Sequence, residues 1–186
     1  MEADWEFEVG GDAPVIDARW VGFVDLQREP GAAWELPEVR ELPALGMALE
    51  RLNAGSSPVW TSKCDFYPVL QAEEFNADEM DAGGGSCVDG VGCYIDVLTK
   101  ADGRWSEPRL VEAACRQVCS TLKRVTLRCC RVDLIVRRVG DVVDSAGLGI
   151  TAYISACGSN GAEARDTLAS ALAAFAGALC LNSTLQ

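Results

Sequence analysis

The strongest constraint on the fold is a pattern that the chain repeats three times: two strand-like runs followed by one helical run. The strand-like runs are rich in β-branched and aromatic residues, whereas the helical runs place apolar residues three and four positions apart. The predicted strands cover residues 5–9, 15–26, 59–69, 91–99, 127–139 and 148–157, and the predicted helices cover residues 36–53, 107–123 and 161–180. We expect one α+β domain over residues 1–186, a two-layer sandwich of about six mostly antiparallel strands with three helices on one face.

Two further features concern the order of these elements. Without its outermost elements the series reads strand-helix-strand-strand-helix-strand, which is the order of ferredoxin-like folds. The second and third units also resemble each other, since "GVGCYIDVL" at 90–98 and "GLGITAYIS" at 147–155 each follow a strand that contains Asp and precede a helix. Internal duplication and convergent strand patterning both explain this resemblance, and the sequence slightly favours duplication.

The strand run "VWTSKCDFYPVL" at 59–70 carries an ammonium, a thiol and a carboxylate at its centre. Such a trio suggests a nucleophile with its activating groups. Successive side chains of a strand, however, point to opposite faces. The alternation places Trp60, Cys64, Phe66 and Leu70 toward the core and Thr61, Lys63, Asp65 and Tyr67 on the opposite face. It therefore separates the thiol from both charged groups and weakens the nucleophile hypothesis.

The next three strands alternate in the same way and collect polar side chains on the face that the helices leave bare. This polar face carries Lys63, Asp65, Tyr67, Tyr94, Asp96, Arg131, Asp133, Arg137, Thr151, Tyr153 and Ser155. All of them except Thr151 and Ser155 are our candidate binding residues.

Three interpretations of the polar face remain open. In the first interpretation the face is a solvated surface with cross-strand ion pairs, because antiparallel sheets often keep one face in contact with water. Tyrosine and arginine are enriched where proteins bind partners, so it is a recognition surface in the second. In the third it is a catalytic site, in which a concavity desolvates the carboxylates and Lys63 and shifts their pKa values.

Nine cysteines and the absence of histidine restrict the chemistry further. Catalysis by Ser-His-Asp or Cys-His groups is excluded within this chain, and the commonest protein ligand of transition metals is missing. The cysteine count is odd, their spacing is irregular and no CxxC pair occurs, so we expect buried thiols rather than a disulfide framework. We predict neither a metal nor a cofactor.

Acidic charge is concentrated in the first half of the chain. Residues 1–90 hold 19 Asp and Glu against 5 Lys and Arg, residues 91–186 hold 9 against 11, and the formal net charge is −12. Nucleic acids and anionic membranes are poor partners for such a chain, since phosphate neutralisation requires a basic surface. A basic protein partner suits it better. Segment 71–90, rich in carboxylates and glycine, is expected to be a flexible acidic loop.

The last twenty residues, "TLASALAAFAGALCLNSTLQ", contain no charged side chain. A helix without a polar side is usually buried or shared with a partner, so we expect a homo-oligomer. The stretch is too rich in alanine for a membrane span, which needs about 20 predominantly apolar residues. The N-terminus, "MEADWEFEVGGD", has neither the basic segment nor the apolar core of a secretory signal, so we expect a cytoplasmic location.

These observations predict a soluble, acidic, non-catalytic binding or interaction protein that uses the polar sheet face. The alternative is a histidine-free enzyme that uses lysine, aspartate and tyrosine of that face for proton transfer or Schiff-base chemistry on a small metabolite.

Overall fold

The computed structural model of the chain describes residues 1–70, 78–80, 82, 87–100, 105, 107–140 and 147–181. The strands are β1 (Glu2–Phe7), β2 (Val15–Asp17), β3 (Val59–Leu70), β4 (Asp89–Thr99), β5 (Cys130–Gly140) and β6 (Gly147–Gly158). The helices are α1 (Pro37–Glu41), α2 (Pro43–Asn53), α3 (Pro108–Leu122) and α4 (Gly161–Cys180), with short 3₁₀ helices at Pro30–Glu35 and Asp78–Met80. The predicted α+β fold, with three strand-strand-helix units, is confirmed.

The six strands form one mixed, mostly antiparallel sheet in the order β1-β5-β6-β4-β3. Neighbours from β5 to β3 are antiparallel, whereas β1 and β2 both run parallel to β5, one beside each half of it. Because β6 is antiparallel to both β4 and β5, those two strands are parallel and α3 connects them around β6. This is the split β-α-β arrangement of ferredoxin-like folds. It is formed by β4, α3, β5 and β6, whereas the sequence predicted the ferredoxin-like order for the series of elements that starts at 15–26 and ends at 127–139.

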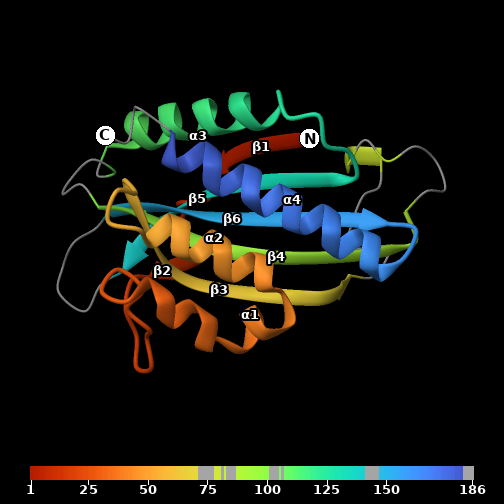
Figure 1. Cartoon of the computed structure of the whole chain (residues 1–186). Helices are drawn as coiled ribbons and strands as arrows, with labels where there is room; N and C mark the ends of the chain where they lie inside the picture. Colours follow the sequence, from red (N-terminus) through yellow and green to blue (C-terminus); the bar gives the residue numbers. More distant parts are fainter. Residues whose placement is uncertain are drawn as a thin grey trace.

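The helices α2, α3 and α4 cover one face of the sheet, with α4 lying along β6 between the other two (Figure 1). The buried residues of α4 are Ala164, Leu168, Ala171, Leu172, Phe175, Ala176, Ala178 and Leu179. Because α4 packs on the sheet and on two helices, its apolar sequence is explained by burial within the chain. Its apolarity is therefore no longer an argument for the predicted homo-oligomer.

The predicted helix at 36–53 is two helices, because Pro43 begins α2. Proline has no amide hydrogen and disfavours a helical conformation at the residue before it. Leu42 accordingly has φ −133° and ψ 84° and separates α1 from α2. β1 begins at Glu2 rather than near residue 5, since pairing with β5 starts there.

The predicted strand at 15–26 is also wrong beyond Asp17, where regular pairing with β5 ends. The following residues turn instead, with an amide-to-carbonyl hydrogen bond from Phe23 to Trp20 of 3.0 Å. Within the described ranges, none of the helices combines the length and apolarity that crossing a membrane requires.

Candidate functional site

The alternation of β4, β5 and β6 follows the prediction and produces a polar face away from the helices. The side chains that face the helices are fully buried, among them Cys93, Ile95, Val132, Leu134, Ile150 and Ile154. On the other side, the register places Tyr94 and Asp133 on either side of Tyr153. Ile135 also lies on this side, opposite Thr151, and is 9% exposed.

β3 departs from the predicted alternation because its register with β4 shifts twice, once between Thr61 and Cys64 and once between Tyr67 and Leu70. The first shift accommodates one extra residue in β3. An inserted residue reverses the side to which the following residues point. The predicted orientations of Trp60 and Thr61 are therefore wrong, whereas Cys64 and Phe66 face the helices as expected.

Thr61 faces the helices because a buried amide holds it there. The Asn53 side chain at the end of α2 donates to the Thr61 hydroxyl (2.7 Å) and accepts from the Thr61 amide (3.0 Å). Asn53 is 1% exposed and Thr61 3% exposed, so both polar groups would be costly to bury without each other. Trp60 consequently points to the polar face.

One end of the polar face is covered by the chain itself. After β2 the chain crosses this face from β5 toward β3: the Ala18 amide donates to Gly140 of β5 (3.1 Å), and the Ser62 hydroxyl of β3 donates to the Asp17 carbonyl (2.6 Å). The covered end consists of Ile16, Ala18, Trp60, Leu98 and Val139. The crossing segment thus shields from water the apolar side chains on this side of the sheet.

Gly149 of β6 permits the close approach of the crossing segment. A Cβ atom at this position would lie 2.9 Å from Ile16 Cδ1 and 3.3 Å from the Val97 carbonyl oxygen. Both distances are shorter than ordinary contacts of a side-chain carbon, and the carbonyl belongs to the backbone of β4. The small residue therefore lets Ile16 pack directly onto the sheet.

Lys63 belongs to the covered end rather than to the centre of the polar face. Its ammonium lies 3.5 Å from the Asp17 carboxylate and 5.0 Å from the ring centroid of Trp20. The side chains of Lys63 and Asp17 are 40% and 61% exposed, so their ion pair stabilises the fold little.

The Cys64 thiol is not activated. Burial, together with smaller effects of the Glu38 and Asp65 carboxylates, raises its pKa to about 12. Since the thiolate is the nucleophilic form, Cys64 is an inert thiol at neutral pH. The central trio of β3 therefore does not act as one catalytic group.

A hydrogen-bonded network crosses the centre of the polar face. Arg137 donates to the carboxylate of Glu8 through Nε (2.9 Å) and Nη2 (2.6 Å). Through Nη1 it donates to the hydroxyls of Tyr153 (3.1 Å) and Thr151 (3.3 Å). The Thr151 hydroxyl donates in turn to Asp96 Oδ1 (2.6 Å). These contacts connect the end of β1 to β4 and fix the orientation of Tyr153.

Asp96 is the most buried carboxylate of the polar face, with 6% exposure. Burial raises the pKa of its carboxyl group, while the hydrogen bond from Thr151 and the charge of Arg137 oppose this rise without cancelling it. The ionised form of Asp96 is therefore held at a cost to the folded state.

Beyond Asp96, three aromatic rings form a row across β3, β4 and β6, which we call the tyrosine row: Tyr67, Tyr94 and Tyr153. Ring centroids are 6.3 Å apart between Tyr67 and Tyr94 and 6.0 Å apart between Tyr94 and Tyr153. Burial raises the pKa of Tyr67, and the charge of Asp65 adds a smaller rise. Burial also raises the pKa of Tyr94. The Tyr67 and Tyr94 hydroxyls make no hydrogen bond to another residue that the structure describes.

A hollow of about 270 Å³ lies beside the tyrosine row, between β1 and β5. We call it the acidic hollow; it is lined by Asp4, Trp5, Glu6, Arg131, Asp133 and Ile135. Arg131 Nε contacts both Asp133 oxygens at 2.8 Å, and its Nη1 binds Glu79. Burial raises the pKa of Asp133, although the bond from Arg131 opposes the rise. Asp4 and Glu6 have no ion-pair partner among the described residues.

The acidic loop predicted at 71–90 lies partly outside the described residues, which omit 71–77, 81 and 83–86. The described part includes Glu79, which forms an ion pair with Arg131 at the edge of the acidic hollow. The predicted flexibility of this loop falls largely on residues outside the described part.

The expectation that every cysteine is a thiol is wrong for Cys87 and Cys157, which form a disulfide. Their separation of 70 residues in the chain hides the pairing from any local motif. Cys129 lies close by, and the three sulfur atoms are all within 4.8 Å of one another. Within the described ranges this sulfur cluster is the one group of cysteine, aspartate or glutamate side chains close enough to hold a metal ion.

Four acidic residues of the site were missing from the sequence prediction: Glu2, Asp4, Glu6 and Glu8. Glu2, Asp4 and Glu6 alternate along β1 and so share the polar face, but the predicted strand started too late to include Glu2 and Asp4. Glu8 was in that strand, but its contact with Arg137 depends on the pairing of β1 with β5. The period-two spacing of these four acidic residues was the available signal.

Comparison of the chain with protein-family models, with curated proteins and with solved structures gives no match.

Proposed function

We propose that this chain is an acidic, non-catalytic interaction protein whose tyrosine row and acidic hollow bind a basic segment of a protein partner. The observation that carries the proposal is a hollow of about 270 Å³ with three carboxylates, Asp4, Glu6 and Asp133, directly beside the partly exposed rings of the tyrosine row. Its one arginine, Arg131, already pairs with Asp133 and Glu79. An arginine or lysine side chain of a partner fits this arrangement, because carboxylates bind guanidinium groups with charge-assisted hydrogen bonds.

The tyrosine row supports the same partner chemistry. A cation that lies over an aromatic face is attracted by the ring, and tyrosine contributes large contact area with few rotatable bonds. The chain already contains such a contact, since the Arg137 guanidinium lies 5.6 Å from the ring centroid of Tyr153. Tyr67 and Tyr94 are the two rings of the row that a partner's cation is expected to meet.

Overall charge also favours a basic partner. The net charge of −12 attracts cationic proteins at long range and increases the rate of encounter, an effect that salt weakens. The exposed carboxylates of β1 add to this field beside the acidic hollow. A partner held this way is expected to dissociate faster as ionic strength rises.

The alternative, a histidine-free enzyme, stays a prediction. Asp96 is the residue that favours it, because a carboxyl group with a raised pKa resembles a general acid or base. Asp96, however, already accepts a hydrogen bond from Thr151 and is 6% exposed, so the acidic hollow is the better site for a ligand. The homo-oligomer and the cytoplasmic location stay predictions as well.

The test is the affinity of the full chain for a hexa-arginine peptide, measured by calorimetry at two salt concentrations. Tyr94→Ala and Asp133→Asn are each expected to weaken binding by about tenfold, the effect of losing a contact that contributes about 1.4 kcal/mol. A hexa-glutamate peptide should show no binding.

Asp166→Asn is the matched control, because it removes one exposed carboxylate from α4 on the helical face. It should leave the affinity unchanged. Equal weakening by Asp166→Asn and Asp133→Asn would show attraction to net charge alone and would overturn the proposal, as would full affinity in Tyr94→Ala.

A further inference from the structure

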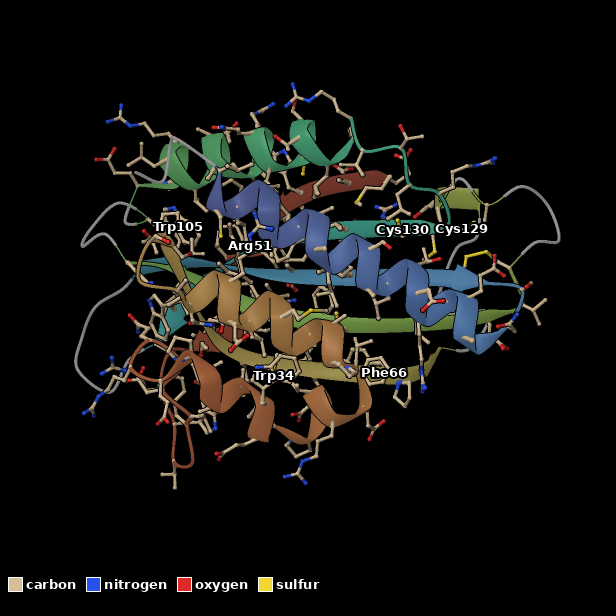
Figure 2. The ribbon with its side chains drawn as sticks, viewed as in Figure 1. Trp34, Arg51, Phe66, Trp105, Cys129 and Cys130 are labelled. Atoms are coloured by element: carbon tan, nitrogen blue, oxygen red, sulfur yellow. A yellow bond between two sulfur atoms is a disulfide. The ribbon has the colours of Figure 1, made fainter. Side chains whose placement is uncertain are left out.

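The sulfur cluster of Cys87, Cys129 and Cys157 lies at the end of the sheet where β4 and β5 begin and β6 finishes. Cys157 is on β6, Cys87 precedes β4 and Cys129 precedes β5, and both of those strands pair with β6, on its opposite sides. Figure 2 shows Cys129 at this end of the sheet, beside Cys130. Cys157 therefore stands between two cysteines that approach it from different strands.

Two backbone hydrogen bonds fix Cys129 next to Cys157. The Cys129 carbonyl accepts from the Cys157 amide (2.9 Å), and the Cys129 amide donates to the Met80 carbonyl (2.9 Å). Because Cys130 pairs with Ala156, Cys129 is directly opposite Cys157 in the antiparallel register. A side chain at this position meets that of Cys157 across the two strands.

The backbone of Cys129 is strained. Its φ is 60°, and it is the one non-glycine residue with a positive φ among those that the structure describes. A residue other than glycine adopts this conformation at a cost of about 1 kcal/mol or more, so the surrounding contacts must enforce it. Here the enforced conformation belongs to a thiol that faces a disulfide.

Accessibility distinguishes the three sulfur atoms. Cys157 is fully buried, whereas Cys87 and Cys129 are partly exposed. A thiolate released at Cys87 is therefore better solvated than one released at Cys157. Since a leaving thiolate departs more readily when it is stabilised, attack at the Cys157 sulfur with release of Cys87 is the favoured direction.

We propose that this cluster is a thiol–disulfide exchange site in which Cys157 bonds alternately to Cys87 and to Cys129. The Cys129 thiolate attacks Cys157 Sγ, and a Cys129–Cys157 bond forms while the Cys87–Cys157 bond breaks. The bonding electrons leave with Cys87 as a thiolate, which takes up a proton in place of the one that Cys129 lost. No electron enters or leaves the protein, so no external oxidant or reductant is required.

Exchange changes which strands are linked covalently. In the observed state the disulfide connects the residue before β4 to β6. After exchange it connects the residue before β5 to β6, and Cys87 becomes a partly exposed thiol. That thiol is the group through which a second thiol or disulfide compound reaches the cluster.

The test is disulfide mapping of the full chain after equilibration in a buffer of reduced and oxidised glutathione. Acid quenching, alkylation with N-ethylmaleimide and mass spectrometry with fragmentation then identify the bonded cysteines. We expect both Cys87–Cys157 and Cys129–Cys157 in the unmodified chain. Cys87→Ser should shift Cys157 to the bond with Cys129.

Two variants keep the result interpretable. Cys129→Gly removes the thiol while fitting the backbone at φ 60°, and should leave Cys87–Cys157 as the one bond of Cys157. Cys180→Ser removes a partly exposed thiol outside the cluster and should leave both isomers in their original proportion. The proposal is overturned if the unmodified chain holds Cys87–Cys157 alone, or if Cys157 and Cys129 of Cys87→Ser are both alkylated.

Discussion

At the covered end of the polar face, the chain's own residues 15–23 lie over Trp60 and Leu98; at the other end, no described segment lies over the tyrosine row and the acidic hollow. Both ends belong to the same antiparallel strands. They differ in the side chains that point away from the helices, which are apolar at Leu98 and Val139 but polar at Asp133 and Tyr153.

The two ends of this sheet face are stabilised in different ways. Where outward positions are apolar, water contact is unfavourable and the fold supplies a cover. Where outward positions are tyrosine, arginine and aspartate, the face is stable without one, because Arg137 and Thr151 satisfy the buried polar groups. The open end is the surface that we propose to bind a partner.

Among changes that distinguish the covered end from the open end, truncation of Ile16 should lower the free energy of unfolding the most. Ile16→Ala removes a side chain that is 3% exposed and is expected to cost about 2–5 kcal/mol in the free energy of unfolding. Tyr67→Ala, at the open end, should cost less than about 1 kcal/mol, as surface changes usually do. Urea unfolding of both variants measures the difference, and equal losses would remove the distinction between the two ends.

Adding one methyl group beneath the crossing segment should have the next largest effect. Gly149→Ala places a Cβ against Ile16 Cδ1 and the Val97 carbonyl, and overpacking of this kind costs about 1–3 kcal/mol. Ile16→Val removes the Cδ1 atom, so the double variant should recover part of the loss. If Gly149→Ala is neutral, Ile16 does not pack on the sheet as described.

Asp96→Asn should stabilise the chain by about 0.5–2 kcal/mol at neutral pH, since it removes a charge that burial disfavours. The raised pKa means that folded Asp96 holds its proton more tightly than the unfolded chain does. Stability from this group is therefore present at low pH and is lost as pH rises from the ordinary Asp value of about 3.9 through the raised value.

Thermal unfolding between acid and neutral pH measures this difference. The parent should lose stability relative to Asp96→Asn over that range, and the two curves should converge at low pH. Parallel curves, or a lower midpoint for Asp96→Asn at neutral pH, would contradict a raised pKa of Asp96.

Lys63→Met should have the smallest effect, within about 0.5 kcal/mol, because the exposed pair with Asp17 stabilises little. Calorimetric melting at low and high salt checks this value. A loss well above 1 kcal/mol would mean that the ion pair and the contact with Trp20 hold the crossing segment in place.

The sequence predicted the layers, the helical face and most of the polar face, because those depend on local periodicity. Tyr94, Asp133 and Tyr153 lie where alternation placed them, since β4, β5 and β6 are regular. The register shift between Thr61 and Cys64 was not predictable, because "TSKC" has no glycine or proline that marks an inserted residue, and the bond between Asn53 and Thr61 depends on how α2 packs against β3.

Other features depend on pairing between segments far apart in the chain. The hollow between β1 and β5 needs a parallel pairing across more than 120 residues, and the Cys87–Cys157 bond needs the pairing of β4 with β6. The crossing segment was mistaken for a strand, because Val21, Phe23 and Val24 have strand propensity but lack a neighbouring strand to pair with. Local patterns cannot specify such contacts.

A ¹⁵N NMR titration of the full chain with hexa-arginine tests directly whether the tyrosine row and the acidic hollow bind a basic segment. We expect the largest amide shifts at the open end, around Tyr94 on β4, Arg131 to Asp133 on β5 and Tyr153 on β6, with little change at residues 15–23. Shifts confined to segment 71–90 or to the covered end would contradict this expectation, since they would show that the tyrosine row and the acidic hollow are not the surface that a basic partner meets.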